Sequence, residues 1–272
     1  MTDRPEKTNT GALRLTVLGA RGSMPVGGAD RVIFGGATSC YMVRSGADCV
    51  FLDAGSGLLS APADCPGAPL ILLSHLHLDH VLGLGMFPRL SRKGTLTLLR
   101  FPATSGQNAE RPLDGLYAPP WWPVGLKQYV GALDIAPVEL PMRHGRLYIE
   151  GVRGNHPGGC LIYRVSGGGR SLVYATDYEH DEPSFGRLAD FARGTDLLLY
   201  DSQFSPAEYA RKRGYGHSTA EKGMELMARC GAKRLLLIHH DPQSTDAALL
   251  ERERRIGRAD VRFAREGEVI EL

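Results

Sequence analysis

Four potential metal ligands stand within six consecutive positions of this chain. They are His75, His77, Asp79 and His80, in the run Ser-His-Leu-His-Leu-Asp-His that occupies residues 74–80. Imidazole and carboxylate groups together suit zinc, manganese or iron, and no cysteine stands nearby to supply the thiolate of a structural zinc site. A loop of four unrelated polar residues is the alternative interpretation. So dense a set of ligands favours a metal site, and two adjacent ions rather than one.

The segment before these ligands must bring them to one place. Residues 68–73 are apolar, and the stretch 69–74 is short enough to be a buried strand. Beyond it, His75 and His77 are two positions apart, so in extended backbone they project to one side and can bind the same ion. A helix through Asp79 and His80 would bring these two side chains to a second ion beside the first.

Three further polar residues are candidate ligands, because they follow apolar runs or lie in a glycine-rich turn. Asp177 follows the run 171–175, His239 follows 234–238, and His156 stands in Gly-Asn-His-Pro-Gly-Gly. Open α/β sheets place their chemistry in a crevice outside the strand ends. Taken singly, each residue has a structural alternative as a turn residue, a helix cap or a hydrogen-bonded histidine at a strand end.

The order of these residues resembles that of the metallo-β-lactamase superfamily over nearly the whole chain. The superfamily order is an aspartate, His-x-His-x-Asp-His, a histidine, an aspartate and a histidine. The matching positions are Asp53, His75, His77, Asp79, His80, His156, Asp177 and His239. The resemblance implies two divalent ions, zinc first, with manganese or iron as alternatives.

We expect these residues to divide between the two ions. The first ion would be held by His75, His77 and His156, the second by Asp79, His80 and His239, with Asp177 bridging. Asp53 is expected behind a ligand histidine or its loop rather than on a metal.

Two further elements resemble the phosphodiesterase branch of the superfamily, which contains tRNase Z and phosphoribosyl cyclic phosphodiesterase. His217 lies in Gly-His-Ser-Thr at the start of a helical stretch, and Asp201 closes the apolar run 196–199 with Tyr200. The resemblance implies that His217 protonates the leaving group and that Asp201 orients His217. From the ligand set, we expect Asp79 also to orient the attacking hydroxide. A structural alternative for His217 is a polar residue at the helix start, with Ser218 or Thr219 as the cap.

The glycine-rich amino-terminal segments resemble a small bacterial group within that branch. The matching segments are 19–25 and 35–40, together with His-His-Asp-Pro at 239–242; Ala37 stands where the group often has asparagine. Arg21 or Arg31 could lie near a phosphate cradled by these loops, although ordinary glycine turns are the commoner case. Of the histidine pair, we assign His239 as the ligand because it comes first after the strand, and His240 as a residue behind the ligands or facing the substrate.

Strand-like and helical runs alternate, which predicts an α/β fold. The strand-like runs are 13–18, 39–43, 50–53, 95–101 and 161–165; the helical ones are 185–192, 220–228 and 246–255. The resemblance implies an αββα sandwich of two mixed β-sheets flanked by helices, as one domain over residues 1–272. We expect residues 1–12 to be flexible.

One segment, 101–141, is predicted to be loop-rich and contains both Trp121 and Trp122. Aromatic side chains beside a crevice could form a lid that stacks on a flat group of the substrate. The same side chains could instead form an interface in a homodimer, or pack on the protein's own core.

Composition excludes several classes of protein. A net charge of +2 gives no sign of a broad nucleic-acid surface, and five cysteines without CxxC spacing predict neither a disulfide framework nor a thiolate metal site. No stretch approaches the roughly 20 apolar residues of a membrane span, and the first ten residues contain no apolar signal core. We therefore expect a cytoplasmic protein without a membrane partner.

The substrate is predicted to be small. tRNase Z usually carries an extended arm between the elements that match His156 and Asp177, and only 20 residues separate them here. A small phosphodiester, such as a cyclic nucleotide or a ribose cyclic phosphate, is therefore preferred to a large RNA. The alternatives are a hydrolase of a non-phosphate ester, lactone or thioester, and a metal-containing binding module without catalysis.

Overall fold

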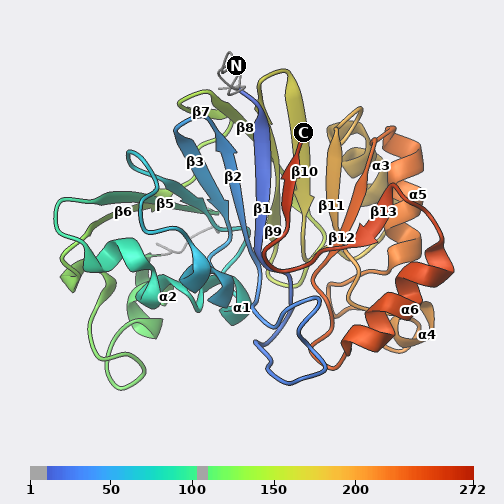
Figure 1. The fold of residues 1–272 in the computed structure, drawn as a ribbon, viewed down its shortest axis with the longest axis horizontal. Helices are drawn as coiled ribbons and strands as arrows, with labels where there is room; N and C mark the ends of the chain where they lie inside the picture. Colours follow the sequence, from blue (N-terminus) through green and yellow to red (C-terminus); the bar gives the residue numbers. More distant parts are fainter. Residues whose placement is uncertain (1–10, 103–109) are drawn as a thin grey trace, which may run out of the picture.

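Two β-sheets lie face to face, with helices on their outer sides (Figure 1). The computed structural model describes residues 11–102 and 110–272, so most of the predicted flexible start, residues 1–10, lies outside the described residues. The architecture confirms the predicted αββα sandwich of two mixed sheets. Among the described residues, no helix is both long and apolar enough to span a bilayer.

The first sheet contains seven strands, and its pairing changes from antiparallel to parallel across its width. From β14 to β3 neighbouring strands are antiparallel, and from β3 to β6 they are parallel. In spatial order the strands are β14 (Val269–Glu271), β1 (Leu13–Gly19), β2 (Cys40–Ser45), β3 (Asp48–Leu52), β4 (Leu70–Leu72), β5 (Leu96–Phe101) and β6 (Ala132–Pro137).

The second sheet repeats this pattern. From β7 to β10 neighbouring strands are antiparallel, and from β10 to β13 they are parallel. In spatial order the strands are β7 (Met142–His144), β8 (Leu147–Gly154), β9 (Cys160–Gly167), β10 (Arg170–Ala175), β11 (Leu197–Asp201), β12 (Leu235–Ile238) and β13 (Val261–Phe263). As a result, β3 and β10 occupy the same place in their respective sheets.

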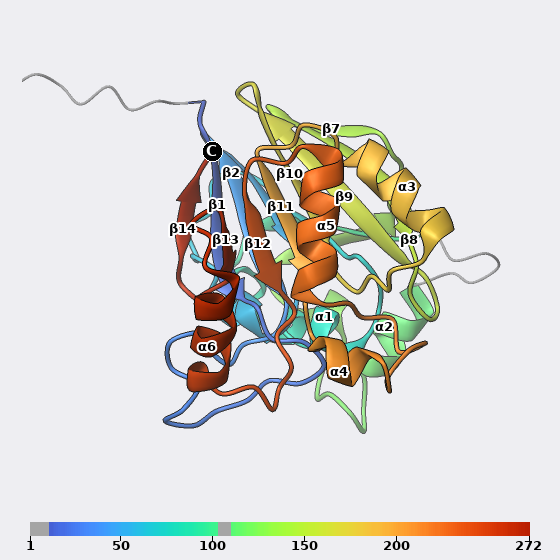
Figure 2. The ribbon, with the colours of Figure 1, turned by 90° about the vertical axis from the view of Figure 1, so that its right-hand side faces the viewer.

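Helices cover the outer face of each sheet. Figure 2 shows α3 (Glu182–Phe191), α5 (Ala220–Cys230) and α6 (Asp246–Ile256) over the second sheet, with the short α4 (Pro206–Tyr209) below α5. The first sheet is covered by α1 (Leu78–Val81), α2 (Glu110–Leu116) and the 3₁₀ turns Ser56–Ser60, Leu84–Met86, Pro88–Ser91 and Leu126–Gln128. Both α5 and α6 begin at a threonine cap and end at a left-handed glycine, as isolated helix signals predict.

The apolar core has three layers. The middle layer lies between the sheets and includes Val17, Leu52, Leu172 and Leu199, all without solvent exposure. The other two layers fill the spaces between each sheet and its helices. Burying one such side chain contributes roughly 1.5–3 kcal/mol, so the inter-sheet layer fixes how the two sets of strand ends face each other.

Three polar residues within two positions of a strand end have positive backbone φ angles although none is glycine. Asp53 follows β3 with φ 61°, Asp177 follows β10 by two residues with φ 47°, and His239 follows β12 with φ 59°. The left-handed conformation costs about 1–2 kcal/mol for a residue with a Cβ atom. Strain of this kind at strand ends marks positions where side-chain direction matters more than local stability.

The predicted loop-rich segment 101–141 is more ordered than expected. Its described residues include helix α2 and strand β6, which extends the first sheet beside β5. β6 pairs on one side only, and its side chains are mostly exposed or half-buried, so the sequence carries no clear alternation of apolar residues. Residues 103–109 of this segment lie outside the described residues.

Leu199 provides a test of the inter-sheet core. We expect Leu199→Ala to lower the free energy of unfolding by about 2–5 kcal/mol, because it leaves a cavity between the sheets. The matched control Leu250→Ala removes a side chain that is 39% exposed on α6, and its effect should stay within about 0.5 kcal/mol. Urea denaturation measures both values, and equal losses for the two variants would contradict the layer assignment.

Candidate metal centre

All seven predicted ligand side chains meet at the edge of the sandwich where α1 lies. The loop after β4 carries His75 and His77, and α1 carries Asp79 and His80. The remaining three residues, His156, Asp177 and His239, come from the loops after β8, β10 and β12. Parallel strands place their carboxyl ends at a common edge, which is why residues distant in sequence come together here.

A first cluster consists of His75, His77, His156 and Asp177. One ligand atom of each lies within 4.8 Å of the others. The Nε2 atoms of His75 and His156 lie 3.6 and 3.8 Å from Oδ2 of Asp177. Nε2 of His156, which faces Asp177, lies 3.2 Å from Nδ1 of His77, so His77 presents Nδ1 rather than Nε2 to the cluster.

A second cluster consists of Asp79, His80 and His239, and it shares Asp177 with the first. Oδ2 of Asp79 lies 3.2 Å from Nε2 of His80 and 3.1 Å from Nε2 of His239. Oδ1 of Asp177 lies 3.1 and 3.2 Å from the same two nitrogens. The two oxygens of Asp177 therefore face different clusters, which is the geometry that a bridging carboxylate requires.

Four of the five clustered histidines are fixed through Nδ1 by an acceptor outside the clusters. Because Nδ1–H donates to each of these acceptors, the ring proton stays on Nδ1 and the lone pair of Nε2 faces the carboxylates. The pairs are His75 with Ser74 Oγ at 3.0 Å, His80 with Asp53 Oδ2 at 2.7 Å, His156 with the Gly216 carbonyl at 3.0 Å, and His239 with Gln203 Oε1 at 3.0 Å.

Asp53 lies behind His80 and does not line the cavity described below. Its fully buried carboxylate accepts hydrogen bonds from the Ser74 amide, the Ser74 hydroxyl, the Tyr174 hydroxyl and Nδ1 of His80, at 2.6–2.7 Å. Ser74 in turn accepts from His75. One carboxylate thus sets the orientation of His80 directly and of His75 through the serine.

The electrostatics of the clusters fit divalent cations. Nε2 of His75 and Nε2 of His80 are buried and make no hydrogen bond with any described residue, despite the carboxylates beside them. Burial alone would lower the pKa of His80, but Asp177, Asp79 and Asp53 raise it well above the usual value. Burial is likewise outweighed at His239, where chiefly Asp177 and Asp79 raise the pKa to about 9. The negative potential that stabilises cationic imidazoles also favours a dication coordinated by neutral ones.

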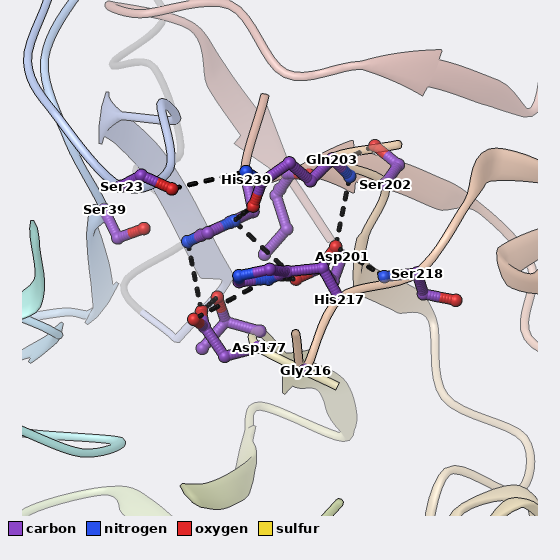
Figure 3. A network of polar contacts seen from close by, with 12 residues as sticks. Ser23, Ser39, Asp177, Asp201, Ser202, Gln203, Gly216, His217, Ser218 and His239 are labelled. Atoms are coloured by element: carbon purple, nitrogen blue, oxygen red, sulfur yellow. Dashed lines mark hydrogen bonds and ion pairs between the residues drawn. The ribbon is translucent and has the colours of Figure 1, made fainter. Parts of the chain in front are cut away.

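His217 and Asp201 form a pair beside the second cluster (Figure 3). Nδ1 of His217 donates to Oδ2 of Asp201 at 2.8 Å, and Oδ1 of Asp201 accepts from the amides of Gln203 and Ser218 at 3.1 Å each. The His217 ring stacks on His239 with centroids 4.7 Å apart. Both members of the pair also lie within metal-binding reach of Asp177 and His239. Since Asp201 engages Nδ1 of His217, Nε2 is the nitrogen left for the cavity.

A cavity of about 390 Å³ opens over the clusters. Its wall includes Ser23, Leu76, Leu78 and His217 as well as four of the clustered residues. An adjoining, mostly apolar cavity of about 200 Å³ continues past His75 and His77. No Lys or Arg lines either cavity among the described residues, so the charge there comes from the clusters.

Arg21 does not lie where a phosphate contact would require it. Its fully buried guanidinium donates to the carbonyls of Gly35, Asp241 and Ser244, at 2.7–3.0 Å. It therefore ties the amino-terminal loop to the segment after β12 and does not line the cavity. Arg31 donates to the Pro242 carbonyl and is also absent from the cavity wall.

His240 points away from the clusters, so the prediction that it faces the substrate is wrong. Its Nε2 donates to the Ala264 carbonyl at 2.8 Å, and its ring packs edge-on against Phe34 and Phe263. Burial lowers the pKa of His240 to about 3, so the ring is neutral. Of the His-His pair, the geometry places only His239 among the carboxylates.

Neither tryptophan lines the cavity. Trp122 packs against Tyr117, and its indole N–H donates to the Tyr129 hydroxyl at 2.9 Å, which corresponds to the core alternative. Trp121 is 76% exposed. The lid prediction is therefore not supported by the positions of these side chains, and for Trp121 an interface role stays a prediction.

Several residues that orient the clusters were not found from the sequence. Gln203 holds His239, Gly216 accepts from His156, and Glu179 accepts from the amides of Gly214 and Gly216. The only signal available for Gln203 and Glu179 was that each stands two positions after a predicted site aspartate. Gly216 has φ 87°, and a Cβ atom there would lie 2.0 Å from Nδ1 of His156, so only glycine fits.

Comparisons with known proteins agree with this fold. The probable metallo-hydrolase YhfI of Bacillus subtilis is 25% identical over 95% of this chain and 100% of its own length. Its crystal structure superposes with a TM-score of 0.74 at 21% identity, covering 96% of this chain and 100% of YhfI. A ribonuclease Z from Gemmatimonas aurantiaca is 38% identical, but over only 38% of this chain and 32% of its own.

A diphosphatase from the PhnP family has the same fold, with a TM-score of 0.66 at 19% identity, covering 96% of this chain and 98% of its own. The model of the beta-lactamase superfamily domain matches residues 44–240, which contain every clustered residue together with Asp53, Asp201 and His217. The chain therefore belongs to the beta-lactamase superfamily.

Proposed function

We propose that the protein is a dinuclear metal-dependent phosphodiesterase that hydrolyses a small phosphodiester, such as a cyclic nucleotide or a ribose cyclic phosphate. The observation that carries this proposal is the His217–Asp201 pair, whose Nδ1–Oδ2 distance is 2.8 Å and whose imidazole lines the cavity over the clusters. An alkoxide leaving from phosphorus is a poor leaving group, so a proton donor beside the metal centre suits phosphodiester hydrolysis.

The two clusters would hold one divalent ion each, with Asp177 between them. Zinc is the proposed metal and manganese or iron the alternatives, because the donors are imidazole nitrogens and carboxylate oxygens. When bound, such a pair lowers the pKa of water toward neutrality and offsets the charge that develops on phosphate oxygens.

The chain's own residues supply the proton and orient it. Nδ1–H of His217 donates to Asp201 and keeps its proton. The second proton of the imidazolium is therefore on Nε2, which faces the cavity. As the bond between phosphorus and the leaving oxygen breaks, that proton passes to the oxygen. The carboxylate of Asp201 stabilises the imidazolium before the transfer and holds the ring in place after it.

The space around the site favours a small substrate. Strands β9 and β10 fill the interval between His156 and Asp177, and they pair directly with each other as a hairpin. That interval therefore contributes no projecting arm to contact a large RNA. Relatives named ribonuclease Z and a diphosphatase share the fold and support chemistry at phosphorus.

Metal removal gives the first test. We expect the purified protein to hydrolyse bis(p-nitrophenyl) phosphate, to lose this activity after chelation, and to recover it with added zinc or manganese. Release of p-nitrophenol reports the rate, and a panel of lactam, lactone and thioester substrates is measured in parallel. Metal-restored turnover of that panel but not of the phosphodiester would contradict the proposal.

The variant His217→Ala separates proton donation from metal binding. We expect it to keep its metal content and to lose about 10²–10⁴-fold in kcat on phosphodiesters with alkyl leaving groups. The loss should be smallest for p-nitrophenyl esters, whose leaving group needs no proton.

A matched control for this variant is His144→Ala, in strand β7, which carries no clustered residue. This control should keep both metals and full turnover. Elemental analysis and steady-state kinetics check these outcomes. An equal loss on alkyl and p-nitrophenyl substrates, or loss of metal from His217→Ala, would show that His217 is not the proton donor.

A further inference from the structure

Gln203 connects the second cluster to the glycine-rich loop at the start of the chain (Figure 3). Its buried side-chain amide accepts from Nδ1 of His239 through Oε1 at 3.0 Å and donates from Nε2 to the Ser23 hydroxyl at 3.3 Å. The sequence gives no sign of this contact, because Ser23 stands 180 positions before Gln203 and His239 stands 36 after it.

The orientation of this amide determines which nitrogen of His239 can bind a cation. With Oε1 facing Nδ1, the ring carries its proton on Nδ1 and presents the lone pair of Nε2 to the carboxylates of Asp79 and Asp177, at 3.1 and 3.2 Å. The reversed amide would place an N–H donor against Nδ1 and move the ring proton to Nε2, where it would block coordination. In the productive orientation, Nε2 of Gln203 faces the Ser23 hydroxyl, which accepts its hydrogen bond at 3.3 Å.

Ser23 contacts the same cluster by a second route. Its backbone has φ 62°, and in this left-handed conformation its amide donates to Oδ2 of Asp79 at 2.6 Å. Four contacts therefore form a closed ring through His239, Gln203, Ser23 and Asp79. Because the Ser23 hydroxyl accepts from Gln203, its own proton is free to donate, and Ser23 lines the cavity.

We propose that Gln203 is a positioning residue for His239, and that it also aims the Ser23 hydroxyl as a hydrogen-bond donor to an unesterified phosphate oxygen of the substrate. This inference rests on the proposed phosphodiesterase function for its second half only. Asp201 is the last residue of β11 and Gln203 stands two residues beyond it, so this end of β11 orients both His217 and His239.

Two substitutions at Gln203 separate its two contacts. Gln203→Met keeps the length of the side chain and removes both contacts. Gln203→Glu keeps an acceptor for Nδ1 of His239, but its other oxygen can only accept from Ser23, which turns the serine proton away from the cavity. Gln243→Met is the matched control, because Gln243 is exposed and its side chain contacts no clustered residue.

Calorimetric titration of zinc into the metal-free protein tests the positioning role without any assay of activity. We expect Gln203→Met to bind the second zinc equivalent roughly 10–100-fold more weakly than the wild type, as is usual when the partner of a ligand histidine is lost. Gln203→Glu and Gln243→Met should bind like the wild type. Equal second-site affinity in Gln203→Met and Gln243→Met would overturn the positioning role.

Steady-state kinetics of the zinc-loaded protein on bis(p-nitrophenyl) phosphate tests the serine donor. We expect Ser23→Ala and Gln203→Glu to raise KM by a similar factor of roughly 10, the cost of one hydrogen bond to a charged oxygen, with normal zinc affinity. An unchanged KM in Ser23→Ala would overturn the donor role. If Gln203→Met does not fold, Gln203→Glu and Ser23→Ala still decide it.

Failure of the proposed function gives a different pattern from failure of this inference. A wild-type protein that binds two zinc ions but hydrolyses no phosphodiester would refute the function and the serine donor, while calorimetry would still judge Gln203. A wild-type protein that binds neither zinc, manganese nor iron would refute both proposals. Wild-type hydrolysis with indifferent Gln203 and Ser23 variants would refute the inference alone.

Discussion

The buried carboxylate of Asp177 is the group on which the rest of the site depends. It is almost fully buried among the described residues. Its two oxygens face different sets of imidazole nitrogens, at 3.1–3.8 Å. Burial penalises this charge, but His239, His80 and His75 hold the pKa of the carboxyl well below its usual range. A buried anion with this surrounding requires compensating positive charge, either on the imidazoles or on cations between them.

Keeping Asp177 central places demands on the backbone around it. Asp53, Asp177 and His239 all leave their strands in the left-handed conformation, which turns each side chain back across the strand ends. Nearby loops approach so closely that a Cβ atom on Gly22 would lie 2.2 Å from the His239 ring. The inter-sheet core must supply the free energy for this strain, since none of these residues relaxes it locally.

The sequence predicted the αββα fold and the residues that meet at the candidate site, but it missed individual elements and contacts. Dense ligands at 75–80 and an ordered series of strand-end residues are local patterns, and the structure brings all of them together. The sequence did not predict the edge strand β6, because a strand that pairs on one side only has no alternating pattern of buried side chains. Arg21 and His240 were placed near substrate because they adjoin motif residues, but neighbours along an extended chain point to opposite sides, and both side chains enter loop packing instead.

The contacts that orient the ligands were beyond sequence reasoning for a physical reason. A ligand's type follows from its chemistry, whereas its Nδ1 partner needs only an acceptor at the right place, and here that acceptor is a serine, a carboxylate, a backbone carbonyl or an amide. Such varied partners share no motif. The end of β11 shows the consequence, because Asp201, its last residue, and Gln203, two residues later, hold different histidines whose rings stack on each other. A shift of this strand end would move His217 and His239 together, so their geometries are coupled.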